Sequence, residues 1–275
     1  MRKVVLGWVL LVAAAMAYAQ PARDNFEYTG KVHSYYGTAH TPQHIQLLTI
    51  LRQADTAERM AKVAQAAFRF RHDLTVVFTT CGGDRLAFYT PKGSAVVLCL
   101  ELLDLMTELA TNDPWMSNLD KRTFTQVFEG ALWGIYFHEL AHALVSINRI
   151  PITGREEDVA DQFAVYFAVN FLEPHGVPVN MPTIWLFQQL AKQRDLSSVD
   201  RAAVRRLMAD EHSLDEQRIF NVACWALGAN PDQGGRTAAE AVGLPASRAE
   251  RCQAEYGRLR YGMGALFQRF LRIKP

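Results

Sequence analysis

The chain has 275 residues, of which 49% are hydrophobic, and a formal net charge of +1. Its 29 basic and 28 acidic residues nearly cancel, so there is no basic excess to attract nucleic acid or anionic lipid. We therefore expect no nucleic-acid partner, and a chain that can bury a large core as one domain or at most two.

The N-terminus has the three parts of a secretory signal peptide. Arg2 and Lys3 are basic, residues 4–16 are uncharged and apolar, and Ala17 and Ala19 form an A-x-A cleavage site. The apolar stretch is shorter than the roughly 20 residues of a membrane span, although an uncleaved N-terminal anchor is the alternative. We expect a signal peptide at residues 1–19, no transmembrane segment in the mature chain, and a periplasmic or secreted protein.

The next part of the sequence changes from irregular to helical. Residues 20–40 are polar with no clear period, and we expect an irregular N-terminal segment there. Apolar residues then recur at helical spacing from Thr41 to about Phe70. Asp55 and Glu58 have the spacing of an N-terminal capping box within this stretch, so we predict two helices instead of one.

Three short segments are typical of β-strands. Residues 74–79, 86–89 and 95–100 are rich in β-branched and aromatic side chains. The last two flank a turn-forming Thr-Pro-Lys-Gly sequence at residues 90–93, which predicts a hairpin. We expect this region to form a small antiparallel sheet.

From Leu100 the sequence predicts helices almost to the end of the chain. Breaks are expected at Pro114, at Gly154, at residues 174–182 and at residues 230–235. The loops between the helices are short, and we find no internal repeat. The predicted fold class is therefore α+β and mostly helical, with residues 41–275 as a single domain.

The four cysteines are predicted to form disulfides, because an even number in an exported chain is typical of a disulfide framework. Four cysteines allow three pairings. Pairing Cys81 with Cys99 and Cys224 with Cys252 closes two short loops, and this is the pairing that we predict.

His138, Glu139 and His142 form an H-E-x-x-H sequence inside an apolar helical stretch. Residues four apart on a helix share a face, so both imidazoles can bind one zinc ion. Glu139 then lies beside the open coordination position, where it can take a proton from water. The extended motif with a third histidine is excluded, because Val145 and Asn148 occupy its glycine and histidine positions. The alternative is a chance spacing of two core histidines and a buried glutamate.

A second predicted helix, after the turn at residues 151–154, supplies the candidate third ligand. It carries an E-x-x-A-D sequence from Glu157 to Asp161, which places the two acids on one helix face. Asp161 can then accept the N–H of a liganding histidine. Of the neighbouring acids, Glu156 fits a capping box with Thr153, and Asp158 reaches less far. We therefore predict Glu157 as the ligand.

These motifs resemble those of the glutamate-zincin peptidases and, more closely, those of an uncharacterised family of exported bacterial proteins described as metallopeptidases. The resemblance spans roughly residues 40–270 and rests on HELAHALV, GREEDVADQFA, CGGDRLAFYTP…VVLCLELL and DEHSLDEQRIFNVACWALGANP. It implies a zincin-like domain with an H-E-x-x-H active-site helix and one Zn²⁺ per chain. The implied ligands are His138, His142 and Glu157, with Glu139 as the catalytic base and a peptide or protein as the substrate.

Zincins also use a side chain to stabilise the oxyanion that forms during hydrolysis. By resemblance, His212 is the candidate for this role. The alternative for His212 is an ordinary surface residue at a helix entrance. Arg218 and Tyr136 also remain open as oxyanion stabilisers.

The sequence thus predicts zinc-dependent hydrolysis of a peptide bond. One alternative is a catalytically silent binding or scaffold protein that keeps the zincin fold. The other is a zinc hydrolase of a non-peptide bond, such as a cell-wall amide. The intact Glu139 argues against the silent protein, because only catalysis needs that residue.

Overall fold

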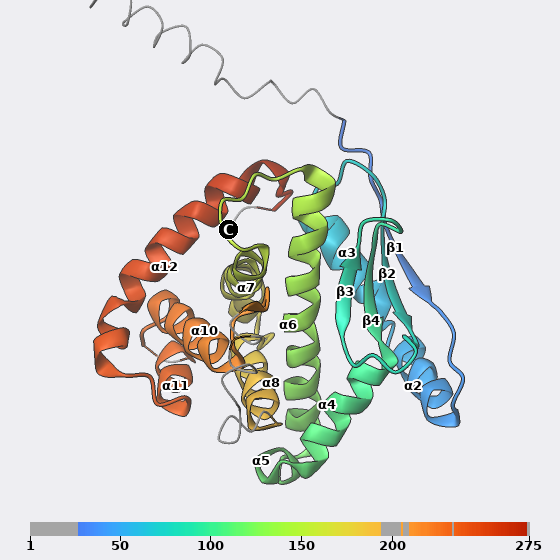
Figure 1. The fold of residues 1–275 in the computed structure, drawn as a ribbon, viewed down its shortest axis with the longest axis horizontal. Helices are drawn as coiled ribbons and strands as arrows, with labels where there is room; N and C mark the ends of the chain where they lie inside the picture. Colours follow the sequence, from blue (N-terminus) through green and yellow to red (C-terminus); the bar gives the residue numbers. More distant parts are fainter. Residues whose placement is uncertain (1–26, 194–204, 206–208, 233, 274–275) are drawn as a thin grey trace, which may run out of the picture.

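The computed structural model describes residues 27–193, 205, 209–232 and 234–273 (Figure 1). The predicted signal peptide at residues 1–19 lies outside the described residues. Within the described ranges, no helix is both long enough and apolar enough to cross a membrane.

The described strands all lie between Val32 and Cys99, with α2 and α3 between the first two of them, and the described elements after Cys99 are helical. The predicted α+β, mostly helical composition is therefore confirmed. The strands are β1 (Val32–Tyr36), β2 (Leu74–Thr79), β3 (Ala87–Thr90) and β4 (Ala95–Cys99). The α-helices are α2 (Pro42–Gln53), α3 (Thr56–Ala67), α4 (Leu100–Asn112), α5 (Pro114–Ser117), α6 (Lys121–Asn148), α7 (Glu156–Phe167), α8 (Asn180–Gln193), α10 (Asp215–Ala229), α11 (Gly234–Ala241) and α12 (Ala246–Phe267). A π-helical segment (Ala168–Leu172) and two 3₁₀ turns (Glu173–His175 and Gln268–Phe270) complete the described elements.

The described strands form a mixed sheet in the order β1-β2-β4-β3, so the prediction of an antiparallel sheet is wrong. β1 pairs with β2 and β2 pairs with β4 in parallel, while β3 and β4 form the predicted antiparallel hairpin. The prediction is wrong because it treats β4 only as a hairpin strand, whereas all residues of β4 are buried. A strand without a polar face is typical of the interior of a sheet, so β4 lies between β2 and β3.

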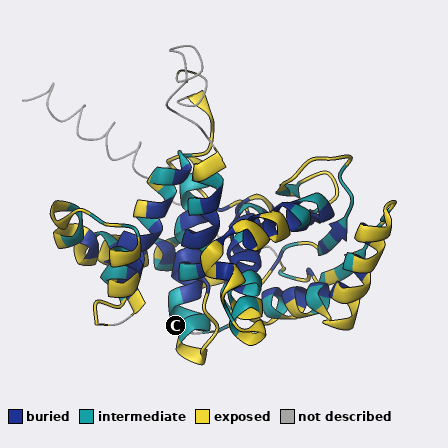
Figure 2. Cartoon of the chain, turned by 90° about the horizontal axis from the view of Figure 1, so that it is seen from below, coloured by how far each residue is buried: buried dark blue, intermediate teal, exposed yellow. Residues whose placement is uncertain are grey.

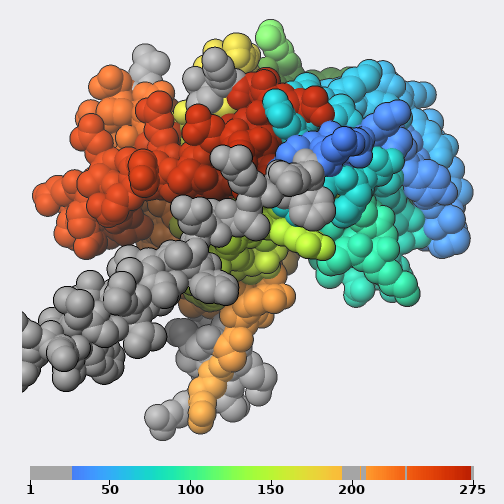
Figure 3. Space-filling model, turned by 90° about the horizontal axis from the view of Figure 1, so that it is seen from above, coloured from blue at the N-terminus to red at the C-terminus, as the bar shows by residue number. Residues whose placement is uncertain are grey.

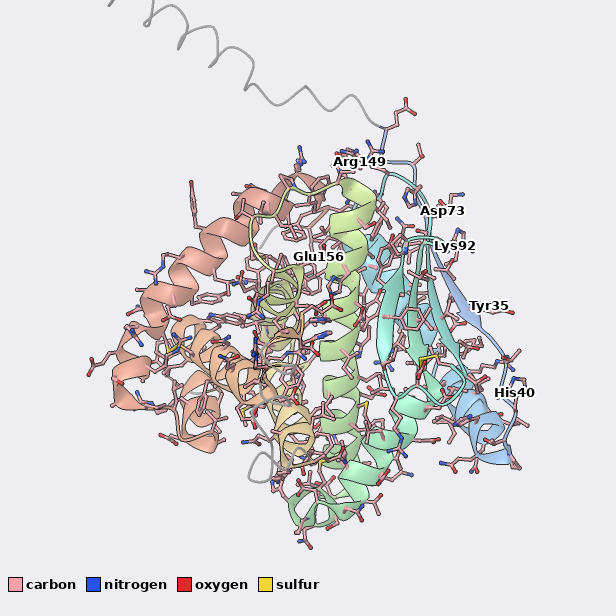
Figure 4. The ribbon with its side chains drawn as sticks, in the orientation of Figure 1. Tyr35, His40, Asp73, Lys92, Arg149 and Glu156 are labelled. Atoms are coloured by element: carbon pink, nitrogen blue, oxygen red, sulfur yellow. A yellow bond between two sulfur atoms is a disulfide. The ribbon has the colours of Figure 1, made fainter. Side chains whose placement is uncertain are left out.

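The prediction of an irregular segment at residues 20–40 is wrong for Val32–Tyr36, which form the edge strand β1. Half-buried and exposed side chains alternate along it, as expected for an edge strand with one covered face. Tyr35 is on the exposed face (Figure 4). The strand is short and carries polar residues, so it lacks the apolar run by which β2 and β4 are predicted.

α3 and α6 cover one face of the sheet. Along β2, every second side chain is fully buried and the intervening ones are half-buried. α3 packs against β1 and β2, and α6 packs against β3 and β4. The hydroxyl of Tyr136 in α6 donates a hydrogen bond of 3.0 Å to the carbonyl of Met60 in α3, which joins the two helices. α6 therefore lies beside β3, the strand at one edge of the sheet.

The two helices predicted between residues 41 and 70 are confirmed as α2 and α3, which meet at Asp55. The predicted capping box is wrong, because Asp55 makes no side-chain cap hydrogen bond. Glu58 instead accepts a hydrogen bond of 2.7 Å from the hydroxyl of Tyr36 in β1. This glutamate therefore ties α3 to the sheet.

α6 passes through the centre of the molecule. It begins after Asp120, whose carboxylate accepts the backbone N–H groups of Arg122 and Thr123, and it ends where Arg149 turns into the left-handed region with a φ of 52°. Its second half is almost entirely buried. Figure 2 shows buried residues gathered in the middle of the molecule and exposed residues on the outer helices.

α7, α8, α10, α11 and α12 lie on the side of α6 away from the sheet (Figure 1). After α12 the chain returns to the N-terminal half. The Phe270 carbonyl accepts the backbone N–H of Arg69 at 2.7 Å, and Leu271 pairs with Phe68 in an isolated β-bridge. Figure 3 shows the C-terminal residues beside the N-terminal part of the chain.

Both predicted disulfides are confirmed. Cys81, ahead of β3, is bonded to Cys99 at the end of β4. Cys224 of α10 is bonded to Cys252 of α12. The first bond fixes the chain that leads into the hairpin, and the second holds two helices of the C-terminal part together.

Candidate metal centre

Two histidines are presented from one face of α6. His138 is 7% exposed, and His142, one turn later, is half-buried. Their Nε2 atoms lie 3.3 Å apart, in agreement with the four-residue spacing on a helix. The two rings therefore direct the same kind of nitrogen toward one point.

α7 packs against α6 and brings Glu157 to these two nitrogens. Glu157 Oε2 lies 3.0 Å from His138 Nε2, and Glu157 Oε1 lies 3.4 Å from His142 Nε2. Each of the three residues offers a ligand atom, and these atoms all lie within 4.8 Å of one another. The structure thus brings together the three residues that the sequence predicts as metal ligands.

A carboxylate holds the second ring nitrogen of each histidine. Asp161 Oδ1 lies 2.8 Å from His138 Nδ1, which is the contact predicted for this aspartate. Glu156 Oε1 lies 2.8 Å from His142 Nδ1. Because a carboxylate accepts, each Nδ1 donates, and each Nε2 is left facing Glu157. Metal-binding histidines generally have a partner of this kind.

The predicted cap at Glu156 is wrong. α7 begins at Glu156 itself, with Arg155 as the N-cap residue and no side-chain cap hydrogen bond. Thr153 therefore lies outside the helix start and does not accept an N–H of its first turn. Glu156, labelled in Figure 4, is free to turn toward α6. Its Oε1 lies 2.8 Å from His142 Nδ1.

Arg218 of α10 completes the His138 side of the cluster. It donates from Nε to Asp161 Oδ2 at 2.8 Å and from Nη2 to Asp161 Oδ1 at 2.7 Å, which is a bidentate pair. Its guanidinium also lies over the ring of Phe187, 4.1 Å from the centroid. These contacts join the guanidinium of Arg218 to Asp161, the carboxylate that holds His138.

The charges of the cluster favour a cation between the two Nε2 atoms. Burial opposes ionisation of Glu157, but its hydrogen bonds with His138, His142 and His212 outweigh burial and hold the pKa of Glu157 far below its ordinary value. Burial also opposes protonation of His138, but Asp161 and Glu157 outweigh it and raise the pKa of His138 to about 9. The carboxylates therefore draw positive charge to this point, and a metal ion supplies such charge.

Glu139 is buried beside the cluster and lines two hollows of the surface. Burial raises the pKa of Glu139 above its ordinary value, while His138 and His142 oppose that rise. A hydrogen bond from the backbone N–H of Tyr89 also opposes it. Tyr89 belongs to β3, so the edge strand of the sheet helps to hold this carboxylate.

His212 lies at the exposed rim of the cluster. Its Nε2 is 2.9 Å from Glu157 Oε2, and its side chain is 46% exposed. This hydrogen bond raises the pKa of His212 above its ordinary value. Glu211, which the sequence did not single out, also offers a ligand atom near those of Glu157 and His212. Tyr136 is fully buried, and its hydroxyl is bonded to α3 instead.

The three converging residues fit a divalent metal ion. Two imidazole nitrogens and one carboxylate oxygen are the donor set of a known class of catalytic zinc site, which keeps a fourth position open. The partners at both Nδ1 atoms are the arrangement that such sites use to fix their histidines. His138, His142 and Glu157 therefore form a group that could hold one metal ion.

Comparison with known proteins places the chain in a family. Neither the curated proteins nor the solved structures yield a match. The sequence profile of a family described as “Putative metallopeptidase” matches residues 36–263, which include both α6 and α7. This match covers most of the chain, and the protein therefore belongs to that metallopeptidase family.

Proposed function

We propose that this protein is a zinc-dependent peptidase with a zincin-like domain, in which His138, His142 and Glu157 bind Zn²⁺ and Glu139 is the general base. The convergence of the three ligand atoms, with each Nδ1 already held by a carboxylate, is the observation that supports the proposal most. When bound, zinc supplies a Lewis acid that polarises a carbonyl oxygen and lowers the pKa of water toward about 7.

Glu139 moves the proton in this scheme. Its carboxylate accepts a proton from the attacking water, whose oxygen bonds to the amide carbon. When the C–N bond breaks, the same carboxyl group gives that proton to the departing nitrogen, so one water and one amide yield an acid and an amine. Burial raises the pKa of Glu139 above its ordinary value, which suits a carboxyl group that first accepts a proton and then gives it up.

His212 is the residue that we propose as the donor to the developing oxyanion. Its Nε2 lies next to Glu157, and its side chain lines both hollows that border Glu139. An N–H donor in that position is within reach of a substrate oxygen bound beside Glu157. Its partial exposure leaves it accessible to a substrate, whereas Arg218 is buried against Asp161.

We also propose that residues 1–19 are a cleaved signal peptide and that the protein acts in the periplasm or outside the cell. The two disulfides support an oxidising compartment. The proposed single domain begins before residue 41, because the edge strand β1 (Val32–Tyr36) pairs with β2 and so belongs to the same sheet.

Metal content and hydrolysis test the proposed function. We expect elemental analysis of the mature protein to find one zinc per chain, and hydrolysis of a peptide mixture to stop on chelation and return with added zinc. Absence of stoichiometric metal would contradict the proposal. Cleavage of cell-wall fragments without cleavage of peptides would assign the site to a non-peptide amide instead.

Substitution of the base tests the mechanism. Glu139→Gln should keep the zinc and reduce hydrolysis by about 10²–10⁴-fold, because the proton acceptor is lost while the ligands remain. Glu129→Gln, at a half-buried position of the same helix that lines neither hollow, is the matched control and should retain both. Activity near wild type in Glu139→Gln would show that another group is the base.

A further inference from the structure

Two hollows of different character meet at Glu139. Ala87, Glu139 and His212 line both of them. One is a cavity of about 210 Å³ between α6, α7, α8 and α10. The other, of about 380 Å³, is bordered by the carboxylates of Glu156, Glu157 and Glu211. A chain that crosses Glu139 therefore has an apolar cavity on one side and, on the other, the hollow that contains the proposed metal ligands His142 and Glu157.

The cavity is suited to an apolar group. Its walls are mainly aliphatic and aromatic side chains, among them Ile135, Val165, Leu186, Phe187, Leu190 and Val222. Asp161 and Arg218 also line it, but their charges are paired with each other at 2.7 and 2.8 Å. The remaining carboxylate of the lining, Glu139, lies where the two hollows meet. A charged ligand group beyond Glu139 would lose its hydration without gaining a free counter-ion, so that part of the cavity disfavours it.

The volume of the cavity determines which substrate side chains can fit into it. An apolar cavity of about 150 Å³ in another protein is large enough to bind benzene. The 210 Å³ found here therefore accommodates a leucine, methionine or phenylalanine side chain.

The cavity is a built feature of the packing. A Cβ atom at Gly134 would collide with Thr183 Oγ1, so the absence of a side chain lets α6 and α8 approach closely. The cavity is also lined by His138 and Glu139. A side chain held there places its own backbone next to the proposed general base.

We propose that this cavity selects the substrate, and that the enzyme cleaves next to a leucine-, methionine- or phenylalanine-sized side chain on one side of the scissile bond. The proposal rests on the proposed peptidase function and adds the substrate class to it.

A peptide library digested by the zinc-loaded mature protein tests this selection. Mass spectrometry of the products should show large apolar residues favoured over alanine by roughly 10- to 200-fold at one position next to the cut. Ile135→Phe should fill the cavity and abolish that preference. Val127→Ala, on the same helix and outside the cavity lining, should leave the preference unchanged. Cleavage without an apolar preference, or a preference unaffected by Ile135→Phe, would overturn the proposal.

A binding measurement separates this proposal from the proposed function. Glu139→Gln protein titrated with N-acetyl-leucinamide, N-acetyl-alaninamide and N-acetyl-lysinamide should bind the leucine compound best, and the added Ile135→Phe change should remove that binding. Leucine binding without hydrolysis in the wild type would keep the cavity as a ligand site and reject the peptidase. Hydrolysis with equal binding of the three amides would reject the cavity alone. Leu190→Phe, at a half-buried position of the same cavity, replaces Ile135→Phe if the latter does not fold.

Discussion

The two histidines of the candidate metal centre are oriented by carboxylates in opposite surroundings. On the His138 side, the side chains of Asp161 and Arg218 are 11% and 12% exposed. On the His142 side, the side chain of Glu156 is 43% exposed. Both histidine–carboxylate distances are 2.8 Å, so burial and not distance distinguishes the two sides.

Burial changes how much each contact contributes to the stability of the folded protein. Removing one partner of a buried ion pair leaves an uncompensated charge in the interior, which is strongly destabilising. A pair open to solvent is screened by water and salt and contributes about 1 kcal/mol or less. We therefore interpret the Arg218–Asp161–His138 contacts as the rigid side of the site and the Glu156–His142 contact as the adjustable side.

The largest effect is expected where the rigid side is broken. Arg218→Met keeps the packing over Phe187 but leaves Asp161 buried without its arginine. We expect the free energy of unfolding of the metal-free protein to fall by about 3–5 kcal/mol, measured by urea denaturation.

The matched control for Arg218→Met is Arg155→Met. Arg155 also contacts an aspartate of α7, Asp158, but its side chain is 50% exposed. A loss of about 1 kcal/mol or less is expected for it. Equal losses for the two variants would show that burial does not separate the arginines, and the comparison between the two sides would fail.

A smaller effect, on metal binding, is expected from Asp161→Asn. The amide oxygen still accepts from His138 Nδ1, but the negative charge that pairs with Arg218 and polarises the imidazole is gone. Zinc affinity should fall by about 10–100-fold, measured by competition with a chromophoric chelator. Asp158→Asn, three residues earlier on the same helix and bonded to Ser213, should leave the affinity unchanged.

The sequence predicts the proposed ligands of this site and Asp161, but not the other groups that hold the site together. The spacing of His138 and His142 and the four-residue step from Glu157 to Asp161 are helix geometry, which depends on neighbours along the chain. Arg218 reaches Asp161 across 57 positions, and the Tyr89 contact uses a backbone N–H that every residue except proline has. Neither leaves a local pattern, so tertiary packing alone brings them to the site.

The errors in the fold have a similar origin. The sequence predicts β4 as the second strand of a hairpin with β3. It does not predict that β4 is buried on both faces and pairs with β2 as well, which places it between β2 and β3. The capping-box pattern matched at Asp55 and at Thr153, yet each glutamate of the pair bonds elsewhere, Glu58 to Tyr36 and Glu156 to His142. A short polar motif has several possible partners, and long-range contacts decide among them.

The smallest effect is expected from Glu156→Gln, on the adjustable side. Glutamine keeps an oxygen that accepts from His142 Nδ1 and removes only the charge of a carboxylate that already faces water. Zinc affinity should therefore fall by about fivefold or less, which corresponds to the contribution of an exposed ion pair. The difference from wild type should shrink further in high salt, because screening weakens the exposed contact, whereas the loss in Asp161→Asn should persist. A loss for Glu156→Gln as large as that for Asp161→Asn, and independent of salt, would mean that His142 is held as rigidly as His138, despite the exposure of its partner.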